Sequence, residues 1–249
     1  MHEAGKAVTR HLSLLIGGVI ALSGCSTSPH IVSFSGRLLP GKTVTIDNFN
    51  GDVAAYPPAL GQPGDQYTVE ATPAGATSEP LPLRVSKERS GLSIENRSNG
   101  RVKLLVRVPK GDNLVVRMRN GSLNISDLDG HANAQSQNGN IHIQMGGYAN
   151  ASTVNGNISA TLGSTTWPGS LHFQTRSGDV EVYVPAVVNA HVKATSLHGT
   201  VFTDFSIPAH ADRTGLIESA EGNIGSGGRG LLILTHNGNV HLMKLVPQM

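Results

Sequence analysis

The segment Gly36–Thr43, with the sequence GRLLPGKT, matches GxxxxGK[ST], the pattern of the loop that holds nucleotide phosphates. That chemistry requires a helix after the loop, because the N-terminus of the helix helps to bind the phosphates. The residues that follow, Val44-Thr45-Ile46-Asp47, instead alternate apolar and polar side chains as a β-strand does. We therefore predict that this segment binds no nucleotide.

Three histidines, His142, His172 and His241, follow turn-like segments at positions where a strand would point its side chain outward. Strands in a sheet lie about 4.8 Å apart, so histidines at matching positions could form a ladder that binds Zn²⁺ or Cu²⁺. Intervening segments carry Ser159 and Glu181 at the corresponding positions. We therefore expect solvated side chains on a strand face, with no metal and no cofactor.

Asp179, Glu181 and Asp204 are the carboxylates that could serve a polysaccharide-cleaving enzyme. Such chemistry needs a carboxylate pair about 5–10 Å apart, and the sequence does not establish one. The sequence also contains no GxSxG or HExxH motif. We predict no catalytic residue, and keep a β-helix enzyme acting on an envelope or extracellular polysaccharide as the alternative.

The N-terminal residues have the pattern of an export signal. Lys6 and Arg10 precede an apolar run of 11 residues, Leu12 to Leu22, which is too short for a membrane span of about 20 residues. The run ends in Leu22-Ser23-Gly24-Cys25, which resembles a bacterial lipobox. The resemblance implies cleavage after residue 24, recognition of Leu22, Ser23 and Gly24 by the signal peptidase, and acylation of Cys25.

Cys25 is the only cysteine in the 249 residues, so no internal disulfide is possible and acylation explains the single thiol. Several acyl chains give stable membrane attachment. Ser26 stands where an aspartate would retain a lipoprotein at the inner membrane, which favours the outer membrane. A net charge of +2 with only 14% charged residues favours neither nucleic acid nor an acidic substrate.

An internal repeat dominates the rest of the chain. Asn138-Gly139-Asn140-Ile141 returns as Asn155-Gly156-Asn157-Ile158, and further segments also join a polar residue, a glycine, a small or polar residue and an aliphatic residue. The period is near 20 residues, which indicates stacked repeats. The repeat-turn glycines are Gly51, Gly121, Gly139, Gly156, Gly178, Gly199, Gly222 and Gly238.

Each repeat alternates apolar and polar residues with a period of two, as in Val180, Val182 and Val184 against Glu181 and Tyr183, which predicts an all-β protein. Asn-Gly between two strands is also a strong hairpin signal, so a meander of hairpins competes with a β-solenoid. The near-constant period favours the solenoid. It predicts that Asn138 and Asn155 lie at the same corner of adjacent coils.

The predicted organisation is a signal peptide over residues 1–24, an anchor or linker over 25–40, an irregular N-terminal β cap over 41–112 and regular solenoid repeats over 113–249. Residues 52–120 lack the period, although the alternation of Leu92-Ser93-Ile94-Glu95 indicates strands there too. Terminal repeats of solenoids are often atypical. A separate small β-domain is the alternative for this segment.

The repeated NGx[IV]x[IV] units, the segment RVPKGDNLVVRMRNGSL at residues 107–123 and the opening VTIDNFNGDV at residues 44–53 resemble the bacterial "putative adhesin" domains of unknown function. The resemblance covers roughly residues 40–245 and implies a β-solenoid that is exported or surface-attached. It brings no catalytic residues to this chain.

We therefore expect a lipid-anchored, non-enzymatic outer-membrane protein whose sheet faces act as a scaffold or binding surface for an unidentified protein or glycan. An envelope regulatory or stress lipoprotein that binds another protein is a further alternative. Aromatic residues for stacking on sugars are scarce. Trp167 lies before a Pro-Gly turn and is either exposed there or packed against the core, and Tyr148 and Tyr183 complete the candidates.

Overall fold

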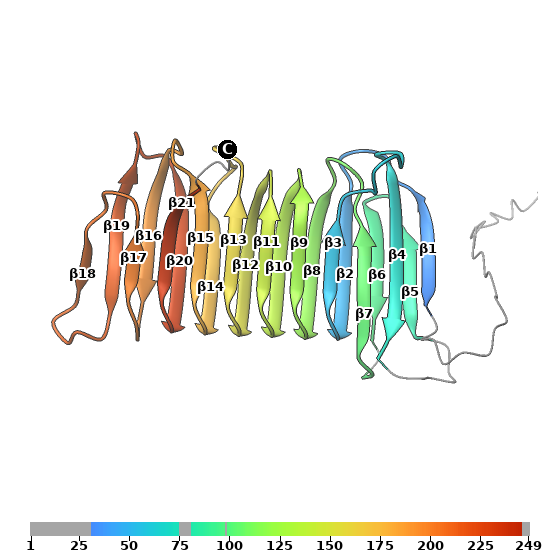
Figure 1. Cartoon of the computed structure of the whole chain (residues 1–249), viewed down its shortest axis with the longest axis horizontal. Coiled ribbons are helices and arrows are strands. Elements are labelled where there is room, and N and C mark those ends of the chain that lie inside the picture. The colour runs from blue at the N-terminus through green and yellow to red at the C-terminus, as the bar shows by residue number, and fades with distance from the viewer. Residues whose placement is uncertain (1–30, 75–80, 98, 246–249) are drawn as a thin grey trace, which may run out of the picture.

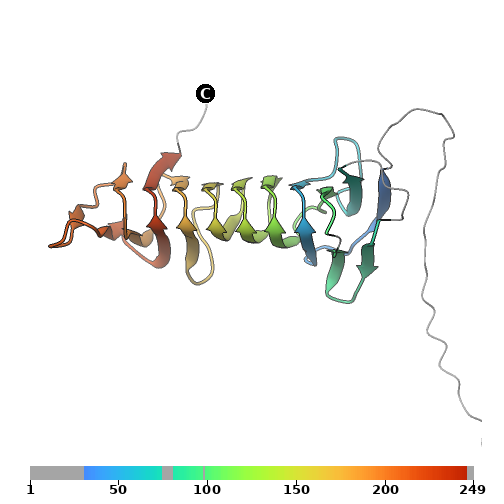
Figure 2. The same cartoon turned by 90° about the horizontal axis from the view of Figure 1, so that it is seen from below.

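The computed structural model describes residues 31–74, 81–97 and 99–245, which form two large β-sheets and no helix. The all-β prediction is confirmed. Figure 1 shows the strands in a row along the long axis, and Figure 2 shows the two layers. Because these residues contain no helix, none of them forms a helix long enough to cross a membrane.

The ten-stranded sheet has the order β1 (Val32–Arg37), β4 (Gln66–Pro73), β7 (Val102–Arg107), β3 (Val53–Tyr56), β9 (Leu123–Leu128), β11 (Ile141–Met145), β13 (Ile158–Leu162), β15 (Val180–Pro185), β21 (Val240–Leu245), β17 (Val201–Thr203). The eleven-stranded sheet has the order β18 (Ala209–Ala211), β19 (Glu218–Ile224), β16 (Ala190–Ser196), β20 (Arg229–Asn237), β14 (Leu171–Ser177), β12 (Tyr148–Asn155), β10 (His131–Asn138), β8 (Asn113–Asn120), β2 (Thr43–Asn50), β6 (Gly91–Asn96), β5 (Leu83–Lys87).

The Asn-Gly segments are corners between the two sheets. Strand β10 lies before Gly139 and pairs in parallel with β8 and β12, whereas β11 lies after Gly139 and pairs in parallel with β9 and β13. A hairpin would have paired β10 with β11. The chain therefore forms coils of two strands, stacked in parallel like the coils of a solenoid, and the meander alternative is wrong.

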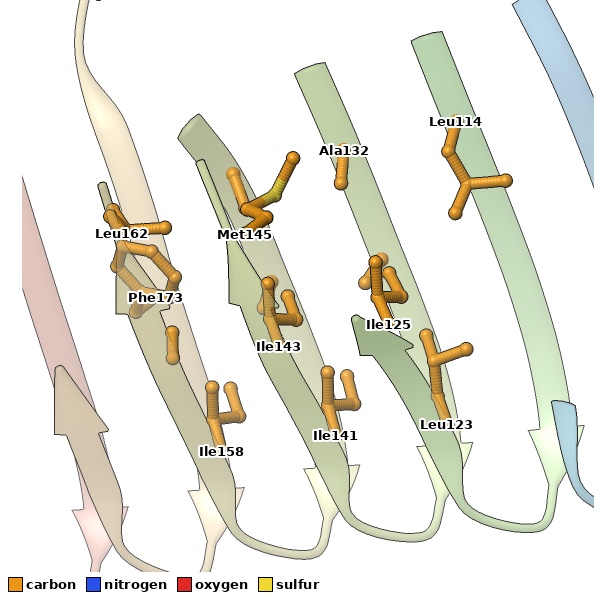
Figure 3. Close-up of a cluster of buried hydrophobic side chains, with 14 of the residues drawn as sticks. Leu114, Leu123, Ile125, Ala132, Ile141, Ile143, Met145, Ile158, Leu162 and Phe173 are labelled. Carbon is orange, nitrogen blue, oxygen red and sulfur yellow. The ribbon is translucent and has the colours of Figure 1, made fainter. Parts of the chain in front are cut away.

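The predicted equivalence of the doubled Asn-Gly-Asn-Ile segments is confirmed. Asn138 pairs with Asn155 and Ile141 pairs with Ile158 in adjacent coils. The Asn155 Nδ2 atom donates to Asn138 Oδ1 at 2.8 Å, and Asn138 Nδ2 donates to Asn120 Oδ1 at 2.9 Å. Ile141 and Ile158 lie in one row of the core between the sheets (Figure 3). Period-two alternation thus places aliphatic side chains inside and polar ones outside.

The residue after each corner glycine explains the preference for Asn and Asp there. Asn140 Oδ1 accepts the backbone N–H of Asn157 at 2.9 Å, and Asn157 Oδ1 accepts that of Asp179 at 2.9 Å. Asp179 Oδ1 in turn accepts the N–H of Asn239 at 2.7 Å. These side chains satisfy backbone donors that would otherwise lie unpaired where the chain leaves one sheet.

Inside the corner, buried hydroxyls perform a similar task. Thr175 Oγ1 donates to the carbonyl of Gly156 at 2.9 Å, and Thr235 Oγ1 donates to that of Gly178 at 2.8 Å. Both threonines are 0% exposed. A buried hydroxyl costs free energy unless it is bonded, so these contacts allow a polar residue at the end of an otherwise apolar inner row.

The stacking order departs from the sequence order at the C-terminal end. Strand β14 pairs with β20 rather than β16, so the coil β20–β21 lies between β14–β15 and β16–β17. The prediction that Gly222 is a repeat turn is wrong. Gly222 lies inside β19, pairs with Val192 in an antiparallel register and has no positive φ.

The N-terminal end shows a second departure. Strands β6 and β7 stack on the outer side of β2 and β3, and antiparallel strands β5, β4 and β1 complete that end. Residues 32–37, predicted as linker, form β1 because Val32 to Arg37 pairs with β4. One hydrophobic core runs from Leu38 to Leu242, so the N-terminal strands share their core with the regular coils.

Candidate functional site

The outer face of the eleven-stranded sheet contains a shallow hollow of about 260 Å³ over strands β6, β2, β8 and β10. We call it the arginine–phenylalanine hollow. Its outward side chains are Asp47, Phe49, Arg97, Arg117, Arg119 and Gln137. The alternation in β2 and β8 turns these side chains away from the core, because the intervening Ile46, Asn48, Val116 and Met118 are buried.

Arg119 and Phe49 form the centre of the hollow. The Arg119 guanidinium carbon lies 4.9 Å from the centroid of the Phe49 ring, and Arg119 Nε donates to Gln137 Oε1 at 3.1 Å. Beside them, Arg117 Nη1 lies 3.6 Å from Asp47 Oδ1. A cation over an aromatic ring gains about 0.5–1 kcal/mol at an exposed site, which orders Arg119 while leaving other guanidinium donors for a ligand.

Two buried amides fix the strands below the hollow. Asn96 Nδ2 donates to Asn48 Oδ1 at 2.7 Å, and Asn48 Nδ2 donates to the carbonyl of Gly51 at 2.8 Å. Both asparagines are at most 2% exposed. Because these bonds join β6 to β2 and β2 to its own corner, they hold the backbones that carry Phe49 and Arg97 in one register.

The predicted lipidation site lies outside the described residues. Cys25 and the recognition residues Leu22, Ser23 and Gly24 all precede residue 31, where the description begins. The acylation of Cys25 therefore stays a prediction.

The structure does not stack His142, His172 and His241 as neighbours. His142 lies in β11, where it pairs with Ser159, and His241 lies in β21 beside Glu181 and Phe202. His172 lies in β14 of the other sheet. Within the described ranges, no group of three or more His, Cys, Asp or Glu side chains is placed to hold a metal ion.

The three candidate carboxylates occupy different surroundings. Asp179 accepts the N–H of Asn239 at a corner, and Glu181 is the second residue of β15, opposite His241 of β21. Asp204 Oδ2 accepts the N–H of Lys244 at 3.1 Å, near the far end of β21. Asp179 and Asp204 therefore accept hydrogen bonds from backbone amides at opposite ends of the strands. They help to hold the backbone in place and do not form an acid–base pair with each other.

The aromatic candidates also lie in different surroundings. Trp167 is 2% exposed and its Nε1 donates to the carbonyl of Gly230 at 3.2 Å, so it packs against the core. Tyr148 is half-buried and stacks on His131 with 4.9 Å between ring centroids. Phe49 is the aromatic residue that lines the hollow, and the sequence reasoning missed it. Its signal was the alternation of Asp47 and Phe49 within TVTIDNFN.

The segment Gly36–Thr43 joins β1 to β2 through a tight turn at Pro40 and Gly41. The strand predicted after it is confirmed as β2. Lys42 Nζ donates to the carbonyl of Arg89 at 2.8 Å, so the lysine that would bind phosphate in a nucleotide-binding loop instead joins two strand ends.

A buried carboxylate near this turn gives the protein a pH dependence. Asp112 is 2% exposed, its Oδ1 accepts the N–H of Lys42 at 2.8 Å, and its Oδ2 has no hydrogen-bond partner within the described part of the chain. Burial raises the pKa of the Asp112 carboxyl, against smaller lowering effects of the backbone hydrogen bonds from Lys42 and Gly41. The ionised form is therefore disfavoured in the folded state.

We expect Asp112→Asn to remove a loss of stability that the wild type shows as pH rises. Because the folded-state pKa of Asp112 lies above the unfolded value of about 3.9, the folded protein binds the proton more tightly. The contribution of this group to the free energy of unfolding is therefore fully present below the pKa of the unfolded state. It is lost as the pH rises through the pKa of the folded state. Urea unfolding of both proteins from pH 3 upward tests this, and a constant difference between them would contradict it.

For Asp212→Asn we expect a pH dependence of stability opposite to that of Asp112→Asn. The hydrogen bond from Thr214 lowers the pKa of Asp212, followed by a bond from the backbone of Ile217. Its contribution is thus present above the unfolded pKa and is lost as pH falls through the folded pKa.

Comparisons with known proteins give a family and several similar structures. No curated protein matches the chain. A structure described as a "putative cell adhesion protein" from Clostridium sporogenes has 12% identity and a TM-score of 0.48, covering 87% of this chain and 100% of its own. A "putative adhesin" from Bacteroides fragilis has 9% identity and a TM-score of 0.40, covering 89% and 100%. The Toastrack DUF4097 family model matches residues 109–243, more than half of the sequence, and the chain therefore belongs to the Toastrack DUF4097 family.

Proposed function

We propose that this chain is a lipid-anchored, non-enzymatic protein of the bacterial cell envelope, whose stacked coils act as a rigid adhesin-like scaffold or binding surface. The observation that carries the proposal is that the two faces of each sheet differ in polarity. The inner faces fill one apolar core, while the outer faces of central strands such as β11, β12 and β14 carry mainly polar side chains. Such a surface offers contact area without a deep cavity.

The surroundings of the candidate carboxylates favour binding over catalysis. A glycoside-cleaving site needs two carboxylates poised about 5–10 Å apart across a substrate. Asp179 and Asp204 accept backbone N–H groups at opposite ends of the strands. The hollow on the outer face is lined by arginine, asparagine and glutamine side chains, one phenylalanine, one methionine and one carboxylate, Asp47, which pairs with Arg117. These groups can orient and hold a ligand.

The anchor is tested by Cys25→Ala, which removes the single cysteine of the sequence. In cells fed a labelled fatty acid, we expect wild-type protein to carry the label and to sediment with membranes, and Cys25→Ala to lose the label and to be released. Two or more acyl chains are needed for stable attachment. Continued labelling of Cys25→Ala would overturn the anchor.

The destination is tested by Ser26→Asp, which keeps the acylation site. We expect the variant to be labelled like the wild type but to separate with inner-membrane fractions, because an aspartate after the lipidated cysteine acts as the retention signal in proteins that carry a lipobox. Unchanged fractionation would contradict the outer-membrane assignment while leaving the anchor in place.

A further inference from the structure

The arginine–phenylalanine hollow lies in the more basic half of the molecule. Residues 31–120 contain twelve lysines and arginines against eight acidic residues, whereas residues 121–249 contain five against eight. Within the hollow, Arg97, Arg117 and Arg119 face Asp47 and the neighbouring Glu95. An anionic ligand is therefore attracted to this end of the row of coils and repelled by the other.

The ion pairs of the hollow are weak enough for a ligand to replace. Arg117 and Asp47 are 3.6 Å apart with side chains 57% and 43% exposed, and Arg97, 3.1 Å from Glu95, is 84% exposed. Exposed pairs of this kind contribute about 0–1 kcal/mol. A ligand carboxylate or phosphate that binds a guanidinium through two parallel hydrogen bonds gains more than the pair that it displaces.

The hollow also has the components that recognise a sugar ring. Phe49 supplies an apolar surface, and Asp47 and Gln137 supply planar acceptors and donors beside it. The Phe49 ring offers an apolar surface against which the C–H face of a saccharide can pack. The Asn96–Asn48 bond and the Arg119–Gln137 bond hold this arrangement before binding, which reduces the entropy lost on association.

We propose that the arginine–phenylalanine hollow binds an acidic saccharide, a sugar that carries a carboxylate or phosphate group. Arg117 and Arg119 bind the anion, Phe49 contacts the apolar side of the sugar ring beside the Arg119 guanidinium, and Asp47 and Gln137 bind hydroxyl groups. The proposal rests on the proposed binding function and names its ligand class and site. A neutral sugar lacks the anion, and free phosphate lacks the ring.

The test uses the full chain in neutral detergent and an acidic probe with its neutral match: oligogalacturonate against its carboxyl-reduced form, and a hexose 6-phosphate against the hexose. Using calorimetry or biolayer interferometry, we expect the dissociation constants of the acidic probes to be at least tenfold lower than those of the neutral ones. Binding should weaken as NaCl rises from 0.05 to 0.5 M, because salt screens exposed charges. Equal binding of acidic and neutral probes would overturn the proposal.

The site is tested by Arg119→Gln and by the double variant Arg117→Gln/Arg119→Gln. Loss of one charge-assisted hydrogen-bond pair should weaken binding roughly tenfold, and loss of both should abolish it. Arg176→Gln is the matched control. Arg176 is an exposed arginine of the same outer face on β14, and we expect binding within twofold of the wild type. Far-UV circular dichroism and thermal unfolding establish that each variant is folded.

The outcomes separate this inference from the proposed function. If the acidic probe binds the double variant as well as the wild type, the site is wrong and the binding function stands. If no acidic probe binds, the ligand class is wrong, and the anchor is judged by the Cys25→Ala experiment alone. If anionic phospholipid vesicles bind through Arg119 while the saccharides do not, the hollow contacts a membrane and the saccharide proposal fails.

Discussion

Replacing Gly139 with alanine is expected to lower the free energy of unfolding by ~3 kcal/mol or more, or to prevent folding. Gly139 has a φ of 145°, in a region where side chains are strained, and a Cβ atom there would lie 1.9 Å from the carbonyl oxygen of Gly121 in the adjacent coil. Strain at such a backbone conformation costs about 1–3 kcal/mol. Overpacking a rigid site adds about 1–3 kcal/mol, and the contact here is with backbone that cannot rotate away.

Gly169→Ala is the matched control, because it isolates backbone strain from the collision. Gly169 also has a positive φ, 70°, but a Cβ atom there would meet no atom within 4 Å. We expect a loss of about 1–2 kcal/mol in urea unfolding, the usual penalty for the left-handed region. Equal losses for Gly139→Ala and Gly169→Ala would show that close stacking of corner backbones is unimportant.

Phe173→Ala is expected to reduce the free energy of unfolding by about 3–5 kcal/mol, the range for deleting a buried aromatic ring. Phe173 is 0% exposed and lies in β14 between Ala151 of β12 and Ile233 of β20. Figure 3 shows it within the buried cluster between the sheets. Its neighbour Ala151 is small, so the surrounding side chains cannot fill the space that the ring leaves.

The comparison is Phe202→Ala, which removes the same ring from β17, where it is 51% exposed and 6.1 Å from the His241 ring. A change within about 0.5 kcal/mol is expected for an exposed residue. The two variants are measured together by urea unfolding. If Phe173→Ala loses no more stability than Phe202→Ala, the row of coils is not held together by its inner core.

The corners of the fold could be predicted from the sequence because their chemistry is local. Corner glycines such as Gly139 adopt a positive φ, and the residues after them, such as Asn140 and Asn157, each accept a backbone N–H of the next coil. Both requirements fall on adjacent residues, so they leave a recurring local pattern in the sequence. The alternation of apolar and polar residues then predicts which side chains enter the core, as for Ile141 and Ile158.

The order of the coils could not be predicted, because every corner offers the same bonds. The Ser196 hydroxyl donates to Gly238 as the Thr235 hydroxyl does to Gly178, so either coil satisfies the corner before it. Which coil follows β14–β15 depends on how β19 covers the far side of β16 in an antiparallel register. That arrangement is non-local, and the spacing of Gly199, Gly222 and Gly238 does not contain it.

The hollow was missed for the same physical reason. Phe49 and Arg119 are 70 residues apart in the sequence and meet only because β2 pairs with β8, with Asn48 opposite Met118 and Asn50 opposite Asn120. The strands themselves were predicted, but a shift of register by one residue would turn these side chains into the core. The sequence analysis expected no metal site at the histidines and no catalytic site at the carboxylates. The structure places His172 in a different sheet from His142 and His241, and Asp204 at the opposite strand end from Asp179.

The ends of the two sheets have a consequence for polymerisation. At the N-terminal end both sheets finish in antiparallel pairs, β1 with β4 and β5 with β6, and at the other end β18 and β17 are three residues each. A second molecule stacked on either end of the row would therefore contact an antiparallel edge strand or a three-residue edge strand, and not a full parallel coil. Within the described residues, neither end of the row presents a full parallel coil, which disfavours end-to-end stacking of molecules into a fibre.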